Sequence, residues 1–225
     1  TVGNQLREAI ELHTDRKGKE AEARAIEMLT LVGVNEPEKR VKQYPYELSG
    51  GMRQRVMIAM ALACEPDILI ADEPTTALDV TIQAQILELM QSLQKKLGMA
   101  IIMVTHDLGV IADMCDEIIV MYGGRVCERG TAEDIFYRPH HEYTKGLLRS
   151  IPNVDRIGEK LIPIPGTPIN LLNMPKGCAF CPRCEEAMKI CIEEQPPEMQ
   201  MPDGHFASCW LNVKAAMEEE KGGRQ

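Results

Sequence analysis

Two carboxylates follow a short apolar run in the middle of the chain. Asp72 and Glu73 come directly after Ile-Leu-Ile-Ala at residues 68–71, a run typical of a buried parallel strand. Ligands bind at the carboxyl ends of strands in open α/β sheets. One acid there can bind Mg²⁺ beside nucleotide phosphates, and its neighbour can polarise an attacking water. The alternative is a pair of acids that cap the next helix.

Two further elements can contact phosphate. Ser49, Gly50 and Gly51 precede a predicted helix over residues 52–64, where exposed backbone N–H groups and a hydroxyl favour an anion. A simple helix cap is the alternative. His106 follows a second predicted buried strand, residues 99–105, and can donate to a phosphate oxygen or hold a catalytic carboxylate. A lone histidine is more often structural.

The third candidate site is a cluster of cysteines. Five of the eight cysteines fall within residues 178–209, and the other three lie apart, at Cys64, Cys115 and Cys127. The spacing C-x5-C-x6-C-x17-C is formed by Cys178, Cys184, Cys191 and Cys209. Four thiolates can bind zinc or a [4Fe–4S] cluster. Cys181 forms C-x2-C pairs with Cys178 and with Cys184, and such pairs are common in zinc sites, so zinc remains an alternative to the cluster. A third interpretation is that the thiols bind no metal. His205, near Cys209, can support the site or be unrelated to it.

The elements that position these residues follow from periodicity. Apolar spacing predicts helices within residues 1–34 and a helix over 80–97 that stops at Gly98. Alternating strand and helix predict a parallel sheet covered by helices. Gly123-Gly124 predicts a hairpin turn, and Thr131 with Asp134 predicts a capping box. Prolines punctuate the chain after residue 138, so we expect domains at 1–137 and 138–225.

Composition limits the function classes. The 225 residues carry a net charge of −9 with a pI near 5.2, which argues against nonspecific binding to duplex nucleic acid. No apolar stretch approaches the ~20 residues of a membrane-spanning helix. The polar start, which begins with Thr1, is not a signal peptide. We expect the chain to be a fragment of a longer protein.

The three phosphate-directed elements, in this order and spacing, resemble the ATP-binding cassette (ABC) family. The resemblance covers about residues 1–130. Its parts are the signature motif at residues 48–52, the Walker B strand at 68–72 with Glu73 as catalytic glutamate, the D-loop at 76–79 and the switch histidine His106. The signature ends in Met52, where many cassettes have Gln.

The resemblance implies an α/β fold, a partial P-loop NTPase with a helical subdomain and a parallel sheet. Two such cassettes close head to tail around two ATP molecules. Ser49, Gly50 and Gly51 would contact the γ-phosphate bound by the partner, and Asp79 would communicate across the dimer. Asp72 would order Mg²⁺, Glu73 would activate water, and His106 would steady the γ-phosphate.

One family motif is missing from the sequence. No G-x-x-x-x-G-K-[ST] phosphate loop occurs in the 225 residues. We therefore expect that this polypeptide alone neither binds ATP tightly nor hydrolyses it.

The C-terminal region narrows the resemblance to oligopeptide and dipeptide importer ATPases. The matching segments are residues 137–144, 147–148, 150–152, 164–166, 177–180 and 182–184. Glu142 stands where members often have Pro. This branch carries the four-cysteine pattern, which implies a [4Fe–4S] cluster in preference to zinc, in a proline-rich extension. Cys181 departs from the branch pattern and can be a bystander or an alternate ligand.

The resemblance implies an ATPase that energises peptide import at the cytoplasmic face of the membrane. Its expected partners are a second ATPase subunit, identical or different, integral membrane permeases and, indirectly, an extracytoplasmic peptide-binding protein, with no nucleic acid. Two alternatives are an ABC protein that acts on DNA or ribosomes and a catalytically inactive regulatory remnant. The sequence does not distinguish dipeptide, oligopeptide, nickel or sugar-derived cargo.

Overall fold

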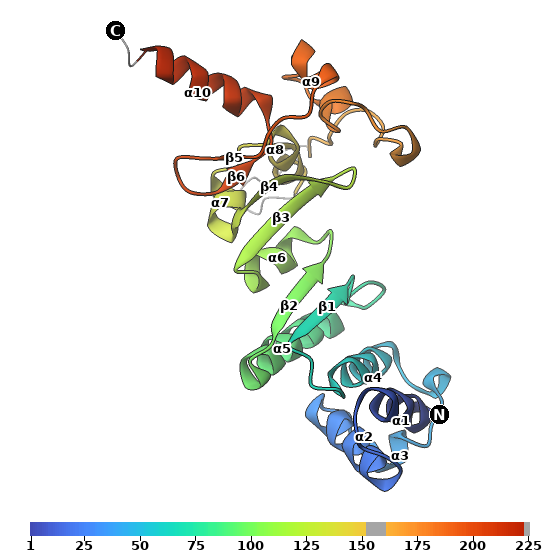
Figure 1. The fold of residues 1–225 in the computed structure, drawn as a ribbon. Coiled ribbons are helices and arrows are strands. Elements are labelled where there is room, and N and C mark those ends of the chain that lie inside the picture. Colours follow the sequence, from blue (N-terminus) through green and yellow to red (C-terminus); the bar gives the residue numbers. More distant parts are fainter. Residues whose placement is uncertain (152–160, 223–225) are drawn as a thin grey trace. The chain divides into compact units, whose positions relative to one another are not determined.

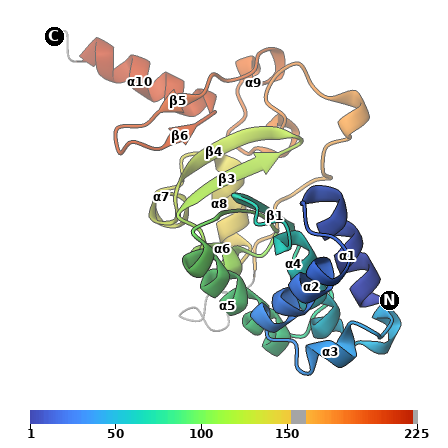
Figure 2. The same ribbon diagram turned by 60° about the horizontal axis from the view of Figure 1, so that its bottom comes forward.

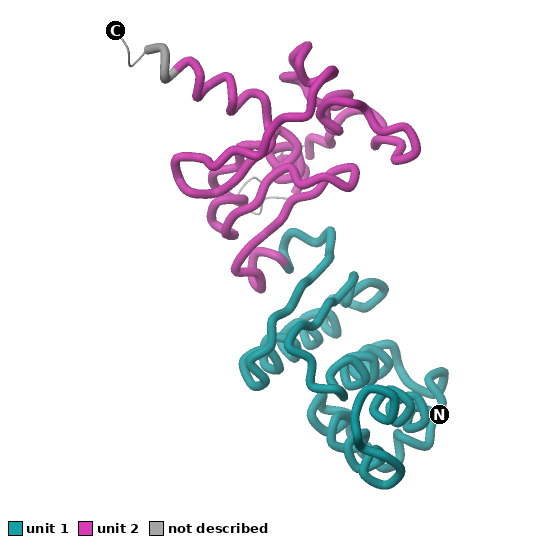
Figure 3. Tube along the Cα trace, in the orientation of Figure 1, with its two compact units in different colours: residues 1–110 teal, residues 111–225 magenta. Residues whose placement is uncertain are grey.

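A computed structural model describes residues 1–151 and 161–222 (Figure 1, and turned in Figure 2). The described chain divides into two units, Thr1–Val110 and Ile111–Gln225 (Figure 3). The predicted boundary at 137/138 lies inside the second unit and stays a prediction. The start of the proline-punctuated stretch, residues 152–160, lies outside the described residues.

The first unit begins with a helical layer and continues into a strand–helix–strand segment. In chain order it contains α1 (Val2–His13), α2 (Lys19–Leu31), α3 (Pro37–Arg40), η1 (Pro45–Glu47), α4 (Gly50–Leu62), β1 (Ile68–Asp72), α5 (Val80–Leu97) and β2 (Ala100–Val104). Helix α6 (Leu108–Met114) follows and spans the division between the units.

Helices α1, α2 and α4 pack together and confirm the predicted helical N-terminal segment (Figure 2). Leu6, Ile10, Leu29 and Leu62 are almost wholly buried between them. Burial of a leucine or isoleucine side chain contributes about 1.5–3 kcal/mol, so this apolar seam holds the layer together. The layer fixes the start of α4, where the candidate phosphate-binding residues lie.

Strands β1 and β2 are parallel, with Asp72 opposite Val104, and α5 connects them. Gly98 ends α5 in the left-handed conformation (φ 69°), as predicted. The prediction of two fully buried strands is wrong for this chain. Ile70 and Ile102 share one sheet face and are 68% and 52% exposed, because none of the described residues of this unit covers that face.

The second unit is built around a four-stranded sheet in the order β3-β4-β6-β5. Its elements are β3 (Glu117–Tyr122), β4 (Arg125–Thr131), α7 (Ala132–Tyr137), α8 (Glu142–Arg149), η2 (Leu171–Asn173), η3 (Cys181–Arg183), α9 (Lys189–Glu193), β5 (Met199–Gln200), β6 (Phe206–Ala207) and α10 (Trp210–Gly222). The hairpin between β3 and β4 turns at two glycines with positive φ, 57° and 74°, which confirms its prediction. The capping box of Thr131 and Asp134 at α7 is also confirmed.

One core of the second unit lies beneath the hairpin. Tyr122, Cys127, Ala179 and Phe180 form it, so the strands and the cysteine-bearing segment share one apolar cluster. The Phe180 ring meets the Tyr122 ring edge-on, with centroids 5.3 Å apart. Strand β4 therefore supports the segment that carries the predicted thiol ligands.

Candidate functional site

The carboxyl ends of β1 and β2 bring a carboxylate and an imidazole into contact. The parallel register places Asp72 opposite Val104, and the backbone N–H of Glu73 donates to the Val104 carbonyl at 2.8 Å. His106 lies two residues beyond that point, and its Nδ1 is 2.7 Å from Glu73 Oε1. Thr76 Oγ1 donates to the other Glu73 oxygen at 2.6 Å.

These contacts set the charge of the pair. The hydrogen bond from Thr76, and then that from His106, lower the pKa of Glu73. The hydrogen bond to Glu73 raises the pKa of His106. The two side chains remain 37% and 82% exposed, so the pair is open to a reactant. Glu73 is thus an ionised, oriented acceptor at neutral pH.

The backbone around the pair adopts sparsely populated conformations. Glu73 has φ 49° and Ala77 has φ 62°, both in the left-handed region that non-glycine residues rarely occupy. Such conformations cost about 1–3 kcal/mol each and cluster at functional sites. Asp107 anchors the other strand end, because it accepts from Gln83 Nε2 at 3.0 Å and from the Gly109 N–H at 3.0 Å.

The predicted signature residues lie at the start of α4. Ser49 is the helix cap, and its Oγ accepts from the Met52 N–H at 3.4 Å. A Cβ at Gly51 would lie 2.8 Å from Cγ2 of Ile82 in α5, so the glycine allows the two helices to approach closely. Asp79 caps α5 through a 3.0 Å bond to the Ile82 N–H.

The structure does not bring every predicted residue of the first unit together. Glu73 and His106 are in contact, whereas Ser49 and Asp79 each bond to their own helix. No hydrogen bond or ion pair of the described residues links Ser49 to the Glu73–His106 pair.

All five clustered cysteines line a single pocket in the second unit. Its wall also includes His141, Glu142, Phe180, Glu186, Trp210 and Leu211, and the cysteines are Cys178, Cys181, Cys184, Cys191 and Cys209. The Cys178 N–H donates to the Cys191 carbonyl at 2.8 Å, which joins two of the thiol-bearing segments. Burial raises the pKa of Cys178, and it raises that of Cys184 to about 12.

Cys127 lies apart from the five clustered cysteines in the sequence but beside one of them in the structure. It is buried in β4 and lines a second pocket together with Cys178 and His141. Burial, and then the charge of Cys178, raise the pKa of the Cys127 thiol to about 12. No sequence signal shows that Cys127 lies beside the thiol pocket.

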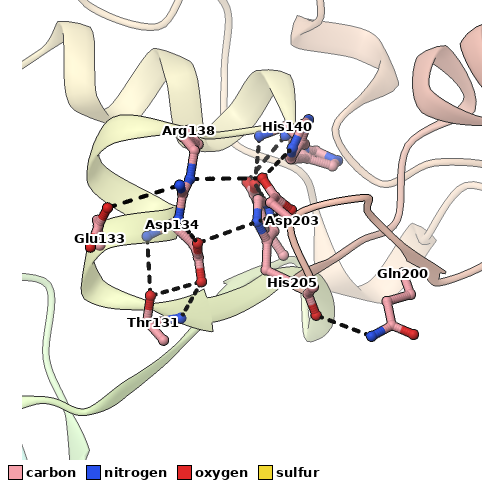
Figure 4. A network of polar contacts seen from close by, with 11 residues as sticks. Thr131, Glu133, Asp134, Arg138, His140, Gln200, Asp203 and His205 are labelled. Atoms are coloured by element: carbon pink, nitrogen blue, oxygen red, sulfur yellow. Dashed lines mark hydrogen bonds and ion pairs between the residues drawn. The ribbon is translucent and has the colours of Figure 1, made fainter.

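Sequence reasoning also missed a buried polar network around β6 (Figure 4). Glu128 and His205 are both essentially unexposed, and Glu128 Oε1 lies 3.1 Å from His205 Nε2. Asp203 and His140 lie beside them. The sequence left open whether His205 supports the thiol site or is unrelated to it. Its direct polar partners are the carboxylates of Glu128 and Asp203.

Comparison with known proteins gives two family matches. Residues 2–76 match the ABC transporter family, and residues 127–191 match the family described as oligopeptide/dipeptide transporter, C-terminal region. Among solved structures, cbiO1 from Clostridium perfringens, described as part of the ABC transporter complex cbiONQ, has a TM-score of 0.53 at 32% identity. That match covers 61% of this chain and 53% of the other.

Curated relatives match over nearly the whole chain. The dipeptide transport ATP-binding protein DppD of Bacillus subtilis is 53% identical over 96% of this chain and 64% of its own length. The oligopeptide transport ATP-binding protein OppD of Salmonella typhimurium is 53% identical over 95% of this chain and 63% of its own length, so this chain spans somewhat less than two thirds of either relative. AppD of Bacillus subtilis, another oligopeptide transport ATP-binding protein, is 49% identical over 100% of this chain and 67% of its own length. The chain therefore belongs to the ABC transporter family, in the branch of oligopeptide and dipeptide transport ATP-binding proteins.

Proposed function

We propose that this chain is part of an ATP-hydrolysing subunit that energises the import of dipeptides or oligopeptides. The observation that carries the proposal is the 2.7 Å contact between Glu73 and His106 at the carboxyl edge of two parallel strands. The match to peptide transport ATP-binding proteins supports the cargo class. The identity of the peptide depends on other subunits.

The residues of the pair have distinct roles in the proposed reaction. Glu73 is ionised, so it orients an attacking water and accepts its proton. The hydrogen bond to Glu73 raises the pKa of His106 and so favours the imidazolium, which donates from Nδ1 to Glu73 and from Nε2 to a phosphate oxygen. Thr76 holds the second carboxylate oxygen and limits rotation of the group. ATP and Mg²⁺, when bound, supply the phosphoryl group and the counter-charge.

Asp72 suits the magnesium site. It lies at the exposed end of β1, and its carboxylate makes no hydrogen bond or ion pair with the described residues. A free carboxylate beside Glu73 matches the hard oxygen ligands that Mg²⁺ prefers. Ser49, Gly50 and Gly51 would offer the α4 N-terminus to a γ-phosphate, and Asp79 would act across the dimer.

The proposed site is one half of a composite. Residues outside this sequence must supply the phosphate loop, since no G-x-x-x-x-G-K-[ST] occurs in it. We place the subunit at the cytoplasmic membrane face with a second ATPase subunit, integral permeases and, indirectly, a peptide-binding protein. None of the described helices has the length and apolarity to cross a bilayer.

The test uses the complete subunit in its reconstituted transporter. Glu73→Gln should retain ATP binding and lower both ATPase rate and peptide uptake by about 10²- to 10⁴-fold, the usual contribution of a general base. Glu88→Gln, an exposed glutamate on α5, is the matched control and should leave both rates unchanged. ATP hydrolysis that persists at the original rate in Glu73→Gln would contradict the proposal.

We also propose that Cys178, Cys184, Cys191 and Cys209 hold a [4Fe–4S] cluster. The Met188 N–H donates to the Cys191 sulfur at 3.4 Å. Nearby backbone N–H groups partly offset the burial that raises the pKa of Cys178, Cys184 and Cys209. Burial of Cys181 raises its pKa without such an offset, which favours its role as a bystander. Hydrogen bonds to sulfur are one of the means by which proteins tune such clusters.

The spacing of the sulfurs favours the cluster over zinc. Zn–S bonds of ~2.3 Å place tetrahedral sulfurs about 3.8 Å apart. Among the described residues, no three of these cysteines have sulfurs within 4.8 Å of one another. A cubane binds each cysteine through a different iron atom, so its sulfurs lie farther apart than around one ion.

Anaerobic purification of the subunit tests this second proposal. Broad visible absorbance and about four irons per chain are expected. Serine at any of the four ligand positions should abolish the absorbance, and Cys181→Ser should retain it as the matched control. A colourless protein with stoichiometric zinc, or loss of iron in Cys181→Ser alone, would overturn the proposal.

A further inference from the structure

We propose that His140, Asp203 and His205 form a second metal site, for one divalent ion of the zinc class. It lies in the polar network of Figure 4, apart from the residues that line the thiol pocket. Among the described residues, this is the set of three such side chains whose ligand atoms all lie within 4.8 Å of one another. Two imidazoles and one carboxylate are ligands that Zn²⁺ favours.

The distances match a small ion's coordination shell. Zinc bonds to nitrogen and oxygen of about 2.0–2.2 Å place neighbouring ligand atoms ~3.3 Å apart in a tetrahedron. His205 Nδ1 lies 3.0 Å from Asp203 Oδ1, and His140 Nε2 lies 3.3 Å from Asp203 Oδ2. The two imidazole rings are 4.5 Å apart between centroids. Three ligands are thus nearly preformed, which leaves a fourth position for water.

His205 carries a buried nitrogen that protein groups leave unsatisfied. The residue is 2% exposed, and its Nδ1 makes no hydrogen bond. Asp203 Oδ1 is close enough, but its direction does not fit a hydrogen bond to that nitrogen. An unmet buried polar atom costs about 1–3 kcal/mol, so a bound ion would explain why the arrangement is tolerated.

Glu128 fixes the tautomer that such an ion needs. Its Oε1 accepts from His205 Nε2 at 3.1 Å, and its two oxygens also accept the backbone N–H groups of His140 and His141. An acceptor saturated in this way places the His205 proton on Nε2, which leaves the Nδ1 lone pair for a metal. A carboxylate behind a metal-binding histidine is the usual supporting arrangement.

The local charge also favours a divalent cation. Glu128, Glu133, Asp134 and Asp203 are four carboxylates, and Arg138 is the cation that pairs with them among the described residues, so the network carries a formal charge of −3 with neutral imidazoles. Arg138 is largely committed to Asp134, with N and O 2.5 Å apart. Its Nε is 3.8 Å from Asp203. A divalent ion would neutralise most of this negative charge.

Three segments of the second unit bring the ligands together, and two of the ligands remain partly exposed to solvent. The ligands come from the loop between α7 and α8, from the β5–β6 turn and from the residue before β6. Gly130 permits the approach, because a Cβ there would lie 2.7 Å from the His205 Cβ. The Asp203 side chain is 22% exposed and His140 28%, which gives an ion a path from solvent. The ion would tie β6 to the α7–α8 loop.

Cobalt is the probe, because its spectrum separates the two metal sites. The full chain, stripped with a chelator, is titrated with Co²⁺. We expect one equivalent to bind with visible d–d bands and without a thiolate charge-transfer band, in addition to any cobalt that the thiol pocket binds with such a band. His140→Ala and Asp203→Asn should each weaken this binding at least tenfold. His13→Ala, an exposed histidine on α1, is the matched control and should change nothing.

The results of the cobalt titration either support or contradict the proposed site. Cobalt bound only with thiolate bands, no binding at all, or unchanged affinity in both His140→Ala and Asp203→Asn would overturn the proposal. Cys178→Ser should leave the nitrogen–oxygen site intact, which separates it from the thiol pocket. If His205→Ala fails to fold, the two partly exposed ligands still decide the result.

Discussion

The two units each contain a glutamate in contact with a histidine, and the two pairs differ in exposure. Glu73 and His106 meet at 2.7 Å with side chains 37% and 82% exposed. Glu128 and His205 meet at 3.1 Å with both side chains fully buried. In the exposed pair the groups can reach a reactant. In the buried pair Glu128 supports other groups, since it satisfies two backbone N–H groups as well as the imidazole.

The largest expected effect is a difference between the two pairs in how much their glutamate contributes to the free energy of unfolding. Glu128→Ala should lower the free energy of unfolding by about 3–5 kcal/mol, because it strands a buried imidazole and two backbone N–H groups. Glu73→Ala should change it by no more than ~0.5 kcal/mol, as for an exposed substitution. Urea unfolding of the two variants measures both values. Equal losses would refute the distinction.

A smaller loss of stability is expected when the glycine that packs against His205 is replaced. Gly130→Ala would force a Cβ to within 2.7 Å of the His205 Cβ, which should cost about 1–3 kcal/mol. Gly50→Ala is the matched glycine control, since its nearest heavy atom would be 3.6 Å away. Thermal unfolding compares them. Equal melting temperatures for the two variants would show that the close approach of Gly130 to His205 does not matter for stability.

The smallest effect concerns titration of the exposed pair. Glu73 raises the pKa of His106, so Glu73→Gln should move that pKa down toward its usual 6.5. The pair's contribution to stability is fully present between pH 4.5 and 6.5. It is lost as pH rises through the raised pKa of His106, and as pH falls through the lowered pKa of Glu73. Histidine ring resonances followed by NMR between pH 5 and 9 report the shift. An unmoved His106 titration would show that the contact does not persist in solution.

Local sequence predicted the main helices and strands of the first unit and, in the second, the β3–β4 hairpin and α7, but none of the elements after residue 138. Helix α5 was predicted with its observed bounds, because apolar residues recur on one face and Gly98 ends it. The hairpin at Gly123-Gly124 and the capping box at Thr131 follow from local backbone preferences. The contact of Glu73 with His106 was foreseeable too, since parallel strands bring their carboxyl ends to one edge.

Only the tertiary structure decided the rest. The sequence by itself determined the family, the strand-end acids and the set of four clustered thiols, because these depend on residue type and short spacing. It could not place Cys127 beside Cys178, nor Glu128 against His205, which is 77 residues away. Such contacts depend on which strands pair, and β4 pairs with β6, a strand far away in the sequence.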